Sequence, residues 1–308
     1  PDRIAPAMRF KNLDLNLLVA LDLLLRERNV SRAAEKMHIT QSAMSNALGR
    51  LRTYFADDLL VPVGRRMELT PRAELLREPV LDILMRIETS VAAMPEFDPS
   101  ASSRTFRIFV SDYTLSTLVP AFLRMIAPHR YPISFEFRPQ VDQPHRPLER
   151  GDADLLIIPR EYASKDHPAE VLYEETFVCI ADAAHPRLGE RLDLEAYCRE
   201  RHAVMRPATS AASFETKSMI DLGVERDIDA VTFSFASLPH LVAGTERLAT
   251  VHARLARAAA RHLPIRILDL PFPLPHMEQS MQWHTYRTND PALIWLKDSM
   301  RAAVVEMG

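Results

Sequence analysis

The sequence has little cysteine, little glycine and no long apolar run, and each shortage excludes a class of protein. Two cysteines, Cys179 and Cys198, cannot form the framework of a disulfide-stabilised secreted protein and favour a reducing compartment. Seven glycines in 308 residues form no phosphate-binding loop or dinucleotide fingerprint. No segment approaches the roughly 20 apolar residues that span a bilayer, and the first residues lack a secretory signal. We therefore expect a cytoplasmic protein that does not contact a membrane.

Catalytic and metal-binding motifs are also missing. The sequence contains no HExxH or GxSxG motif, and its eleven histidines show no pairing with cysteine at the spacing of metal ligands. We therefore predict no catalytic residue, no metal and no cofactor. The alternative from another class is an enzyme, such as a transferase, whose substrate binds between two α/β lobes.

Charge is unevenly distributed along the chain, although the net charge is only −3. Between Arg26 and Arg66 there are eight basic and four acidic residues, an excess of four positive charges. The rest of the chain must then be acidic, which suits a second domain with another task. The basic segment favours DNA binding, and its small excess favours binding as a dimer or larger assembly, because affinity grows with the number of phosphates neutralised.

The segment Val30–Phe55 has the pattern of two short helices joined by a tight turn. Ser31 is predicted to cap the first helix and Thr40 the second, because a hydroxyl can accept from the free N–H groups at a helix start. An apolar stripe on the second helix consists of Met44, Leu48, Leu51 and Phe55. This pattern fits a helix-turn-helix, although an ordinary helical hairpin with a solvated polar face would share it.

Two flanking segments complete a predicted domain over residues 1–70. A leucine-rich helix at Leu13–Arg28 precedes the helix pair and gives it a three-helix core. After the pair, short apolar runs at Leu59–Val63 and Met67–Leu69 surround a basic tip, which indicates a two-stranded wing. Such a tip can touch phosphates or enter the minor groove, although a solvated hairpin tip would look the same.

The polar face of the second helix and the basic tip supply the candidate DNA contacts. Short polar side chains near a helix start can reach base edges, and arginines can meet phosphates. The predicted base contacts are Gln41, Ser42, Ser45 and Asn46. The predicted phosphate contacts are Arg32, Arg50 and Arg52, with Arg65 and Arg66 on the wing.

A long helix is predicted over residues 71–94, beginning with the capping hydroxyl of Thr70 and the proline Pro71. Pro79 should bend it, because proline removes one hydrogen bond of the helix. A heptad seam consists of Val80, Leu84, Ile87, Val91 and Met94. This seam predicts a dimerisation helix, and the alternative is that the stripe packs on its own domain.

Residues 95–103 are rich in proline and serine and are predicted to form a hinge. Alternating strands and helices follow over residues 104–308, which predicts largely parallel sheets covered by helices. We infer two α/β lobes with a cleft between them: lobe I at about 104–181 and 271–308, and lobe II at about 182–270. The segment from Val171 to Ala181 is predicted to be one buried strand.

Candidate ligand residues lie where strands of this domain end. Ser111, Asp112, Tyr113 and Thr114 follow the first strand and begin a helix, whose free N–H groups favour an anionic or polar ligand group. Asp112 would serve equally well as a plain helix cap. The further candidates in the cleft are Arg138, Pro159, Met205, Phe233, Phe235 and His252. Arginine suits a carboxylate or phenolate, and aromatic rings suit an aromatic ligand.

Several segments together resemble LysR-type transcriptional regulators. They are LNLLVALDLLLRERNVSRAAEKMHITQSAMSNALGRLR (15–52), DDLLVPVGRRMELTPRAELL (57–76), RTFRIFVSD (104–112) and GDADLLIIP (151–159). The similarity is close over the N-terminal segments and looser over the remainder. The opening MRFKNLDLNLLVALD (8–22), RTFRIFVSD and the late MQWHTYRTNDPALIWL (281–296) resemble most the branch of nodulation regulators and naphthalene/salicylate regulators.

This resemblance implies a fold class: an N-terminal winged helix-turn-helix, mostly α, with a long linker helix, followed by a two-lobed α/β effector domain like a periplasmic binding protein. It implies a homotetramer of dimers paired through the linker helices, a partly palindromic promoter site, and contact with RNA polymerase. Members of the branch respond to small aromatic compounds. The resemblance therefore implies an activator of catabolic or symbiosis-type promoters whose aromatic inducer binds between the lobes. Asp112, Tyr113 and Thr114 depart from this branch, so the inducer itself does not carry over.

A regulator that senses oxidants through its thiols is the closest rival. Cys179 lies in the apolar strand ETFVCIA and is expected to be buried and inert, whereas Cys198 lies in a helix beside Arg199 and is expected to be half exposed. A regulator that only represses, or that needs no ligand, also remains open.

Overall fold

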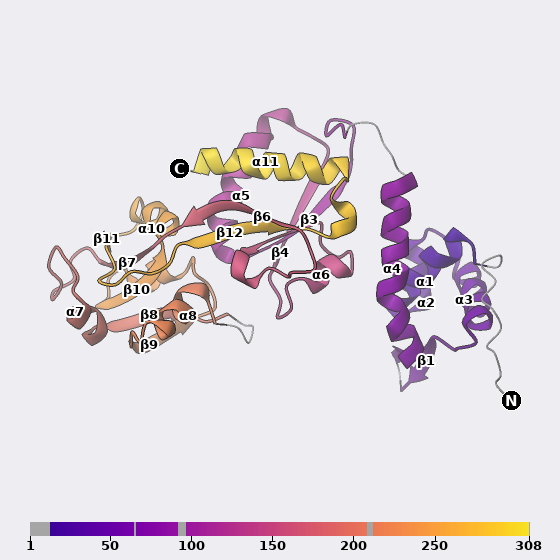
Figure 1. The fold of residues 1–308 in the computed structure, drawn as a ribbon, viewed down its shortest axis with the longest axis horizontal. Helices are drawn as coiled ribbons and strands as arrows, with labels where there is room; N and C mark the ends of the chain where they lie inside the picture. The colour runs from indigo at the N-terminus through magenta and orange to yellow at the C-terminus, as the bar shows by residue number, and fades with distance from the viewer. Residues whose placement is uncertain (1–12, 65, 92–96, 208–211, 308) are drawn as a thin grey trace. The chain divides into compact units, whose positions relative to one another are not determined.

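The computed structural model describes residues 13–64, 66–91, 97–207 and 212–307. The chain divides into two compact units, residues 1–93 and 94–308 (Figure 1). Part of the predicted hinge, residues 95 and 96, lies outside the described residues, as do Arg65 of the wing and Met94 of the seam.

The first unit consists of three short helices, a two-stranded wing and one long helix. Its elements are α1 (Leu15–Glu27), α2 (Val30–Lys36), α3 (Gln41–Phe55), β1 (Leu60–Val63), β2 (Arg66–Leu69) and α4 (Pro71–Val91). All four residues of the predicted α3 stripe are buried, and they pack with Leu21 and Leu24 of α1 in one apolar core. Each fully buried leucine or methionine contributes about 1.5–3 kcal/mol to folding.

The helix caps in this unit agree with the prediction at α3 and differ at α2. The Thr40 hydroxyl accepts from the Ala43 N–H at 3.2 Å, as predicted. At α2, Asn29 and not Ser31 is the cap, because the Asn29 side chain accepts from the Arg32 N–H at 3.0 Å. The helix starts at Val30, so Ser31 already lies within the first turn and cannot cap it.

The long helix α4 begins at the predicted proline and continues through Pro79. The first two positions of the predicted seam do not face outward. Val80 is buried in the core of its own unit, and Leu84 packs against that core. At these two positions the stripe therefore packs on its own domain, as the alternative to a dimer seam predicted. Another stripe on α4 is exposed, since Leu75 and Ile83 expose 78% and 45% of their surface.

The second unit contains two five-stranded sheets, one in each lobe. The lobe I sheet has the order β4 (Ser134–Pro139), β3 (Thr105–Val110), β5 (Leu155–Pro159), β12 (Met277–Gln282) and β6 (Ala169–Glu175). The lobe II sheet has the order β11 (Ile265–Leu268), β7 (Phe177–Asp182), β10 (Arg247–His252), β8 (Arg201–Met205) and β9 (Asp227–Thr232). In each sheet two of the four strand pairings are parallel and two are antiparallel. One strand, β12 in lobe I and β7 in lobe II, runs opposite to the other four of its sheet.

Helices cover both sheets. Those of lobe I are α5 (Asp112–Ile126), α6 (Arg146–Glu149) and α11 (Pro291–Met307), and those of lobe II are α7 (Leu194–Arg199), α8 (Phe214–Asp221), α9 (Leu238–Val242) and α10 (Ala253–Ala260). Short 3-10 turns lie at Ala127–His129, Arg160–Tyr162 and Thr285–Arg287. Helices α5 and α11 lie side by side in lobe I (Figure 1).

The predicted single strand from Val171 to Ala181 is wrong. It is two strands in different sheets, β6 and β7, separated by Thr176 alone. The lobe I segment therefore ends near residue 175 and not near 181. No proline or glycine marks the change of sheet, although the polar residues Glu174, Glu175 and Thr176 interrupt the apolar ones there.

Candidate DNA-binding surface and interlobe site

The polar face of α3 is exposed, as a reading helix requires. Gln41, Ser42, Ser45 and Asn46 are all exposed and lie in the first turns of the helix. The Ser42 hydroxyl lies 3.0 Å from the capping hydroxyl of Thr40. Because the opposite stripe of α3 is anchored in the core, these four side chains are presented together on a rigid element.

The predicted phosphate contacts divide into two groups. Arg32 and Arg66 are exposed, and Arg50 is exposed with one long contact of 3.3 Å to Asp14. Arg52 is different, because its guanidinium donates to the carbonyl oxygens of Asp58 and Leu60, both at 2.8 Å. These bonds hold the first strand of the wing against α3. Arg52 therefore has a structural role that the prediction of a phosphate contact missed.

Sequence reasoning also missed the contacts that fix the wing and α4 on the helical core. Arg28, at the end of α1, donates to Glu68 of the wing at 2.7 Å and to Glu74 of α4 at 3.2 Å. Asp57 accepts from the Thr70 hydroxyl at 2.6 Å and from the backbone of Leu59 at 2.7 Å. The two partners of Arg28 are 40 and 46 residues away, so they leave no local pattern in the sequence.

In the second unit, the segment after β3 begins α5. The Ser111 hydroxyl caps the helix and accepts from the Thr114 N–H at 3.2 Å. Asp112 is therefore not the cap. Its carboxylate crosses to lobe II, where it accepts from the Ser234 hydroxyl at 2.7 Å and from the Ala236 N–H at 2.9 Å. Thr114 is buried and accepts from the Gln279 side-chain amide at 3.0 Å.

Tyr113 points into the protein and not into an open cleft. Its hydroxyl donates to the buried carboxylate of Glu175, which also accepts from Arg254 of α10 at 3.2 Å. The ring of Tyr113 stacks on His252 with centroids 3.7 Å apart. Burial raises the pKa of the Tyr113 hydroxyl and lowers the pKa of His252 to about 3, so both side chains are neutral near pH 7.

Aromatic side chains of the protein itself fill the region between the lobes. The ring of Phe235 meets His252 edge-on at 4.6 Å, and Phe177 lies 4.9 Å from the same histidine. Phe177 also stacks on Phe214 at 5.7 Å. These side chains belong to one core that is continuous from lobe I to lobe II. The structure thus brings Tyr113, Phe235 and His252 together, and sequence reasoning missed Phe177 and Phe214.

The other predicted ligand residues are dispersed. Met205 is buried in the same core, whereas Phe233 exposes 82% of its surface. Arg138 pairs with Glu136 on its own strand at 2.8 Å, and Pro159 is half-buried at the end of β5. A carboxylate two residues away thus already accepts from Arg138.

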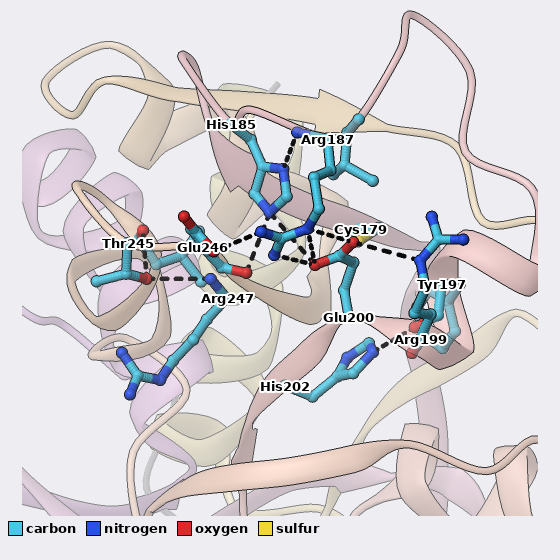
Figure 2. Close-up of polar contacts among 12 residues, drawn as sticks. Cys179, His185, Arg187, Tyr197, Arg199, Glu200, His202, Thr245, Glu246 and Arg247 are labelled. Atoms are coloured by element: carbon cyan, nitrogen blue, oxygen red, sulfur yellow. Dashed lines mark hydrogen bonds and ion pairs between the residues drawn. The ribbon is translucent and has the colours of Figure 1, made fainter.

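A hollow of about 470 Å³ lies elsewhere, at the starts of β8, β9 and β10 in lobe II. It is lined by Arg187, Arg199, Glu200, Arg201, Asp227, Asp229, Glu246 and Arg247. Arg187 donates to Glu200 at 2.5 Å and to Glu246 at 2.6 Å (Figure 2). The hydrogen bonds from Arg187 lower the pKa of Glu200. Four arginines and four carboxylates line the hollow, and their ion pairs connect the starts of the strands. None of the predicted ligand residues lines it.

The cysteines offer little to a thiol sensor. Cys179 is fully buried, and burial raises the pKa of its thiol to about 12, so the reactive thiolate is disfavoured. Cys198 is partly exposed. Among the described residues, no group of three or more histidine, cysteine, aspartate or glutamate side chains is arranged to hold a metal ion. Within the same residues, no helix has the length and apolarity needed to cross a membrane.

Comparison with known proteins gives the same two-part division. Residues 15–74 match the model of the bacterial regulatory helix-turn-helix proteins of the lysR family, and residues 99–304 match the LysR substrate binding domain. Nodulation protein D 1 of Rhizobium leguminosarum bv. phaseoli is 41% identical over 94% of this chain and 93% of its own. Nodulation protein D 3 of Mesorhizobium japonicum is 39% identical over 95% of this chain and 98% of its own.

A solved structure agrees with these matches. A protein described as a probable transcriptional regulator from Pseudomonas aeruginosa superimposes with a TM-score of 0.67 at 28% identity, over 95% of this chain and 98% of that one. The matched models, the relatives and the fold together cover nearly all of the sequence. The chain therefore belongs to the LysR family of DNA-binding transcriptional regulators.

Proposed function

We propose that this regulator binds a promoter through α3 and responds to a small aromatic effector, and that it acts as an activator of catabolic or symbiosis-type promoters. The observation that carries the DNA-binding part is the exposed face of Gln41, Ser42, Ser45 and Asn46 on a helix whose other face is buried. This division between a reading face and an anchored face is what a helix in the major groove requires.

In this proposal, base edges are read by the polar residues near the start of α3. Arg32, Arg50 and Arg66 contact phosphates, and Arg65 remains a candidate on the wing. Phosphate contacts add affinity on every sequence, whereas base contacts separate one sequence from another. DNA binding places the protein in the cytoplasm, and regulation is its role, with no catalytic step.

Self-association is part of the same proposal. Leu75, Pro79 and Ile83 are exposed and lie four residues apart, so they share one face of α4. Pairing of this face between two copies would remove exposed apolar surface from water. It would also set two α3 helices on neighbouring half-sites. We propose dimers of this kind, assembled into a tetramer that contacts RNA polymerase.

The aromatic effector is supported by two observations. The relatives at 41% and 39% identity are nodulation proteins D, and aromatic rings of the protein occupy the region between the lobes. Rings offer an aromatic ligand offset or edge-on packing. The remaining predicted residues, Arg138, Pro159, Met205 and Phe233, stay candidates for contacts with the effector.

The proposal is tested by removing one reading side chain. Duplexes are first selected from a random pool with the wild-type protein, and affinities are then measured by fluorescence anisotropy at fixed salt. We expect Gln41→Ala to weaken binding to the selected duplex by about 1–3 kcal/mol and to reduce discrimination against other sequences. Gln143→Ala, an exposed glutamine of the second unit, is the matched control. Unchanged affinity and unchanged discrimination in Gln41→Ala would refute the assignment of α3.

A further inference from the structure

The loop after β9 in lobe II is an organised cluster of hydroxyl groups. The Thr232 and Ser237 hydroxyls lie 2.8 Å apart, and the Ser237 hydroxyl donates to the Ser234 carbonyl at 2.8 Å. The backbone N–H of Ser237 donates to the Ser234 hydroxyl oxygen at 3.3 Å. All these bonds lie within lobe II.

Two donors of this loop meet on a single oxygen atom. The Ser234 hydroxyl and the Ala236 N–H both donate to Oδ2 of Asp112, which belongs to lobe I. Asp112 is not needed to cap α5, because Ser111 does so. The contact is therefore an internal anion held by a donor pair of the other lobe.

A donor pair of this kind suits other anionic oxygens equally well. A carboxylate or phenolate oxygen would accept the same two bonds, which are stronger than those to a neutral acceptor. Aromatic surface adjoins the pair on both sides in the chain. Phe233 exposes 82% of its surface, and Phe235 packs its ring on His252. The surroundings therefore suit an aromatic anion better than an aliphatic one.

We propose that the Ser234 hydroxyl and the Ala236 N–H form an anion subsite of the effector site, which the carboxylate of Asp112 fills in this structure. An aromatic carboxylate or phenolate takes the two bonds and displaces Asp112. This inference rests on the proposed effector role of the lobe pair. Binding would then remove one contact between the lobes, while Lys217–Glu161 at 3.3 Å and Tyr162–Ala212 at 3.3 Å remain.

Competition between Asp112 and the ligand predicts the direction of a mutational effect. If Asp112 fills the subsite most of the time, the apparent affinity of the wild-type protein for an anion equals the intrinsic affinity multiplied by the fraction of molecules whose subsite is free. Removing the competing carboxylate should therefore tighten binding of an anion. A neutral ligand of the same shape should gain nothing, because the donor pair distinguishes charge and not shape.

The experiment compares benzoate with benzamide, and phenols at pH values below and above their ionisation, by calorimetric titration of the full chain. We expect Asp112→Ala to bind benzoate about tenfold more tightly than wild type, with benzamide unchanged. Asp112→Asn should show a smaller gain, since its amide still offers an acceptor. The double variant Asp112→Ala with Ser234→Ala should lose the gain. Asp193→Asn, which removes a carboxylate that caps α7 within lobe II, is the matched control and should match wild type.

Hydrogen exchange of the peptide containing Ala236 gives an independent readout. Its amide should exchange faster in Asp112→Ala, and benzoate should slow the exchange again. An unchanged affinity for both benzoate and ionised phenols in Asp112→Ala, or an equal gain for benzamide, would overturn the subsite. A gain confined to benzoate would assign a carboxylate, and one confined to ionised phenols a phenolate. DNA binding is measured separately on wild type, so a failure of the regulatory role is distinguishable from a failure of this subsite.

Discussion

Glu175 offers a sharp test of how the interlobe core is held together. Its side chain is 1% exposed, accepts from the Tyr113 hydroxyl and accepts from Arg254 at 3.2 Å. Glu175→Ala leaves a cation and a hydroxyl without their shared acceptor. Breaking a buried ion pair from one side costs about 3–5 kcal/mol. Because the Arg254 side chain is 23% exposed, water recovers part of this, and we expect a loss of about 2–4 kcal/mol.

The chain reports this loss without a label. Both tryptophans, Trp283 and Trp295, lie in the second unit, so tryptophan fluorescence during urea unfolding follows that unit alone. Glu175→Gln keeps an acceptor and should cost about 1–2 kcal/mol. Glu174→Ala, on the same strand with a side chain 65% exposed, is the control and should change little. A loss below about 1 kcal/mol for Glu175→Ala would refute the reasoning.

Three further predictions follow from single contacts. The pKa of Glu200 is lowered by folding, so its contribution to the free energy of unfolding is complete above pH 4.5, its ordinary pKa, and is lost as the pH falls below that value. Urea unfolding at a series of acidic pH values should therefore show a weaker loss of stability for Glu200→Gln than for wild type. Arg50→Ala should weaken binding to all duplexes and lower the salt dependence by about one unit without changing the melting temperature, whereas Arg52→Ala should lower the melting temperature. A thiol reagent should modify Cys198 and not Cys179 in the native protein, and rapid reaction of both would contradict the burial of Cys179.

Local patterns in the sequence predicted the helices of the first unit because they follow from spacing alone. The stripe of α3 and its cap at Thr40 needed only the helical period and one hydroxyl. The cap of α2 was misplaced by two residues because Asn29 and Ser31 are both good caps, and only the backbone decides between them. Helix boundaries are uncertain by about this amount wherever two capping residues are neighbours.

The interlobe site was predicted only in part, because its contacts join distant segments. Residues 111–114 were placed correctly at a strand end, but no sequence pattern indicates that Asp112 reaches a loop more than a hundred residues further along. No sequence pattern indicates the hydrogen bond between Tyr113 and Glu175 either. Hydrophobic periodicity also cannot show that the chain changes sheets at Thr176, because no proline or glycine separates β6 from β7 and the two strands follow each other directly.

The position of β12 has a consequence for how the protein is made. This strand lies between β5 and β6 in the lobe I sheet, yet it follows all of lobe II in the chain. On the ribosome, lobe I must therefore wait with a gap inside its sheet until residues 277–282 emerge, while every strand of lobe II is already available. We expect lobe II to acquire protection first during synthesis. Chains truncated near residue 270 should expose one edge of β5 and leave β6 without a partner strand, and both invite aggregation.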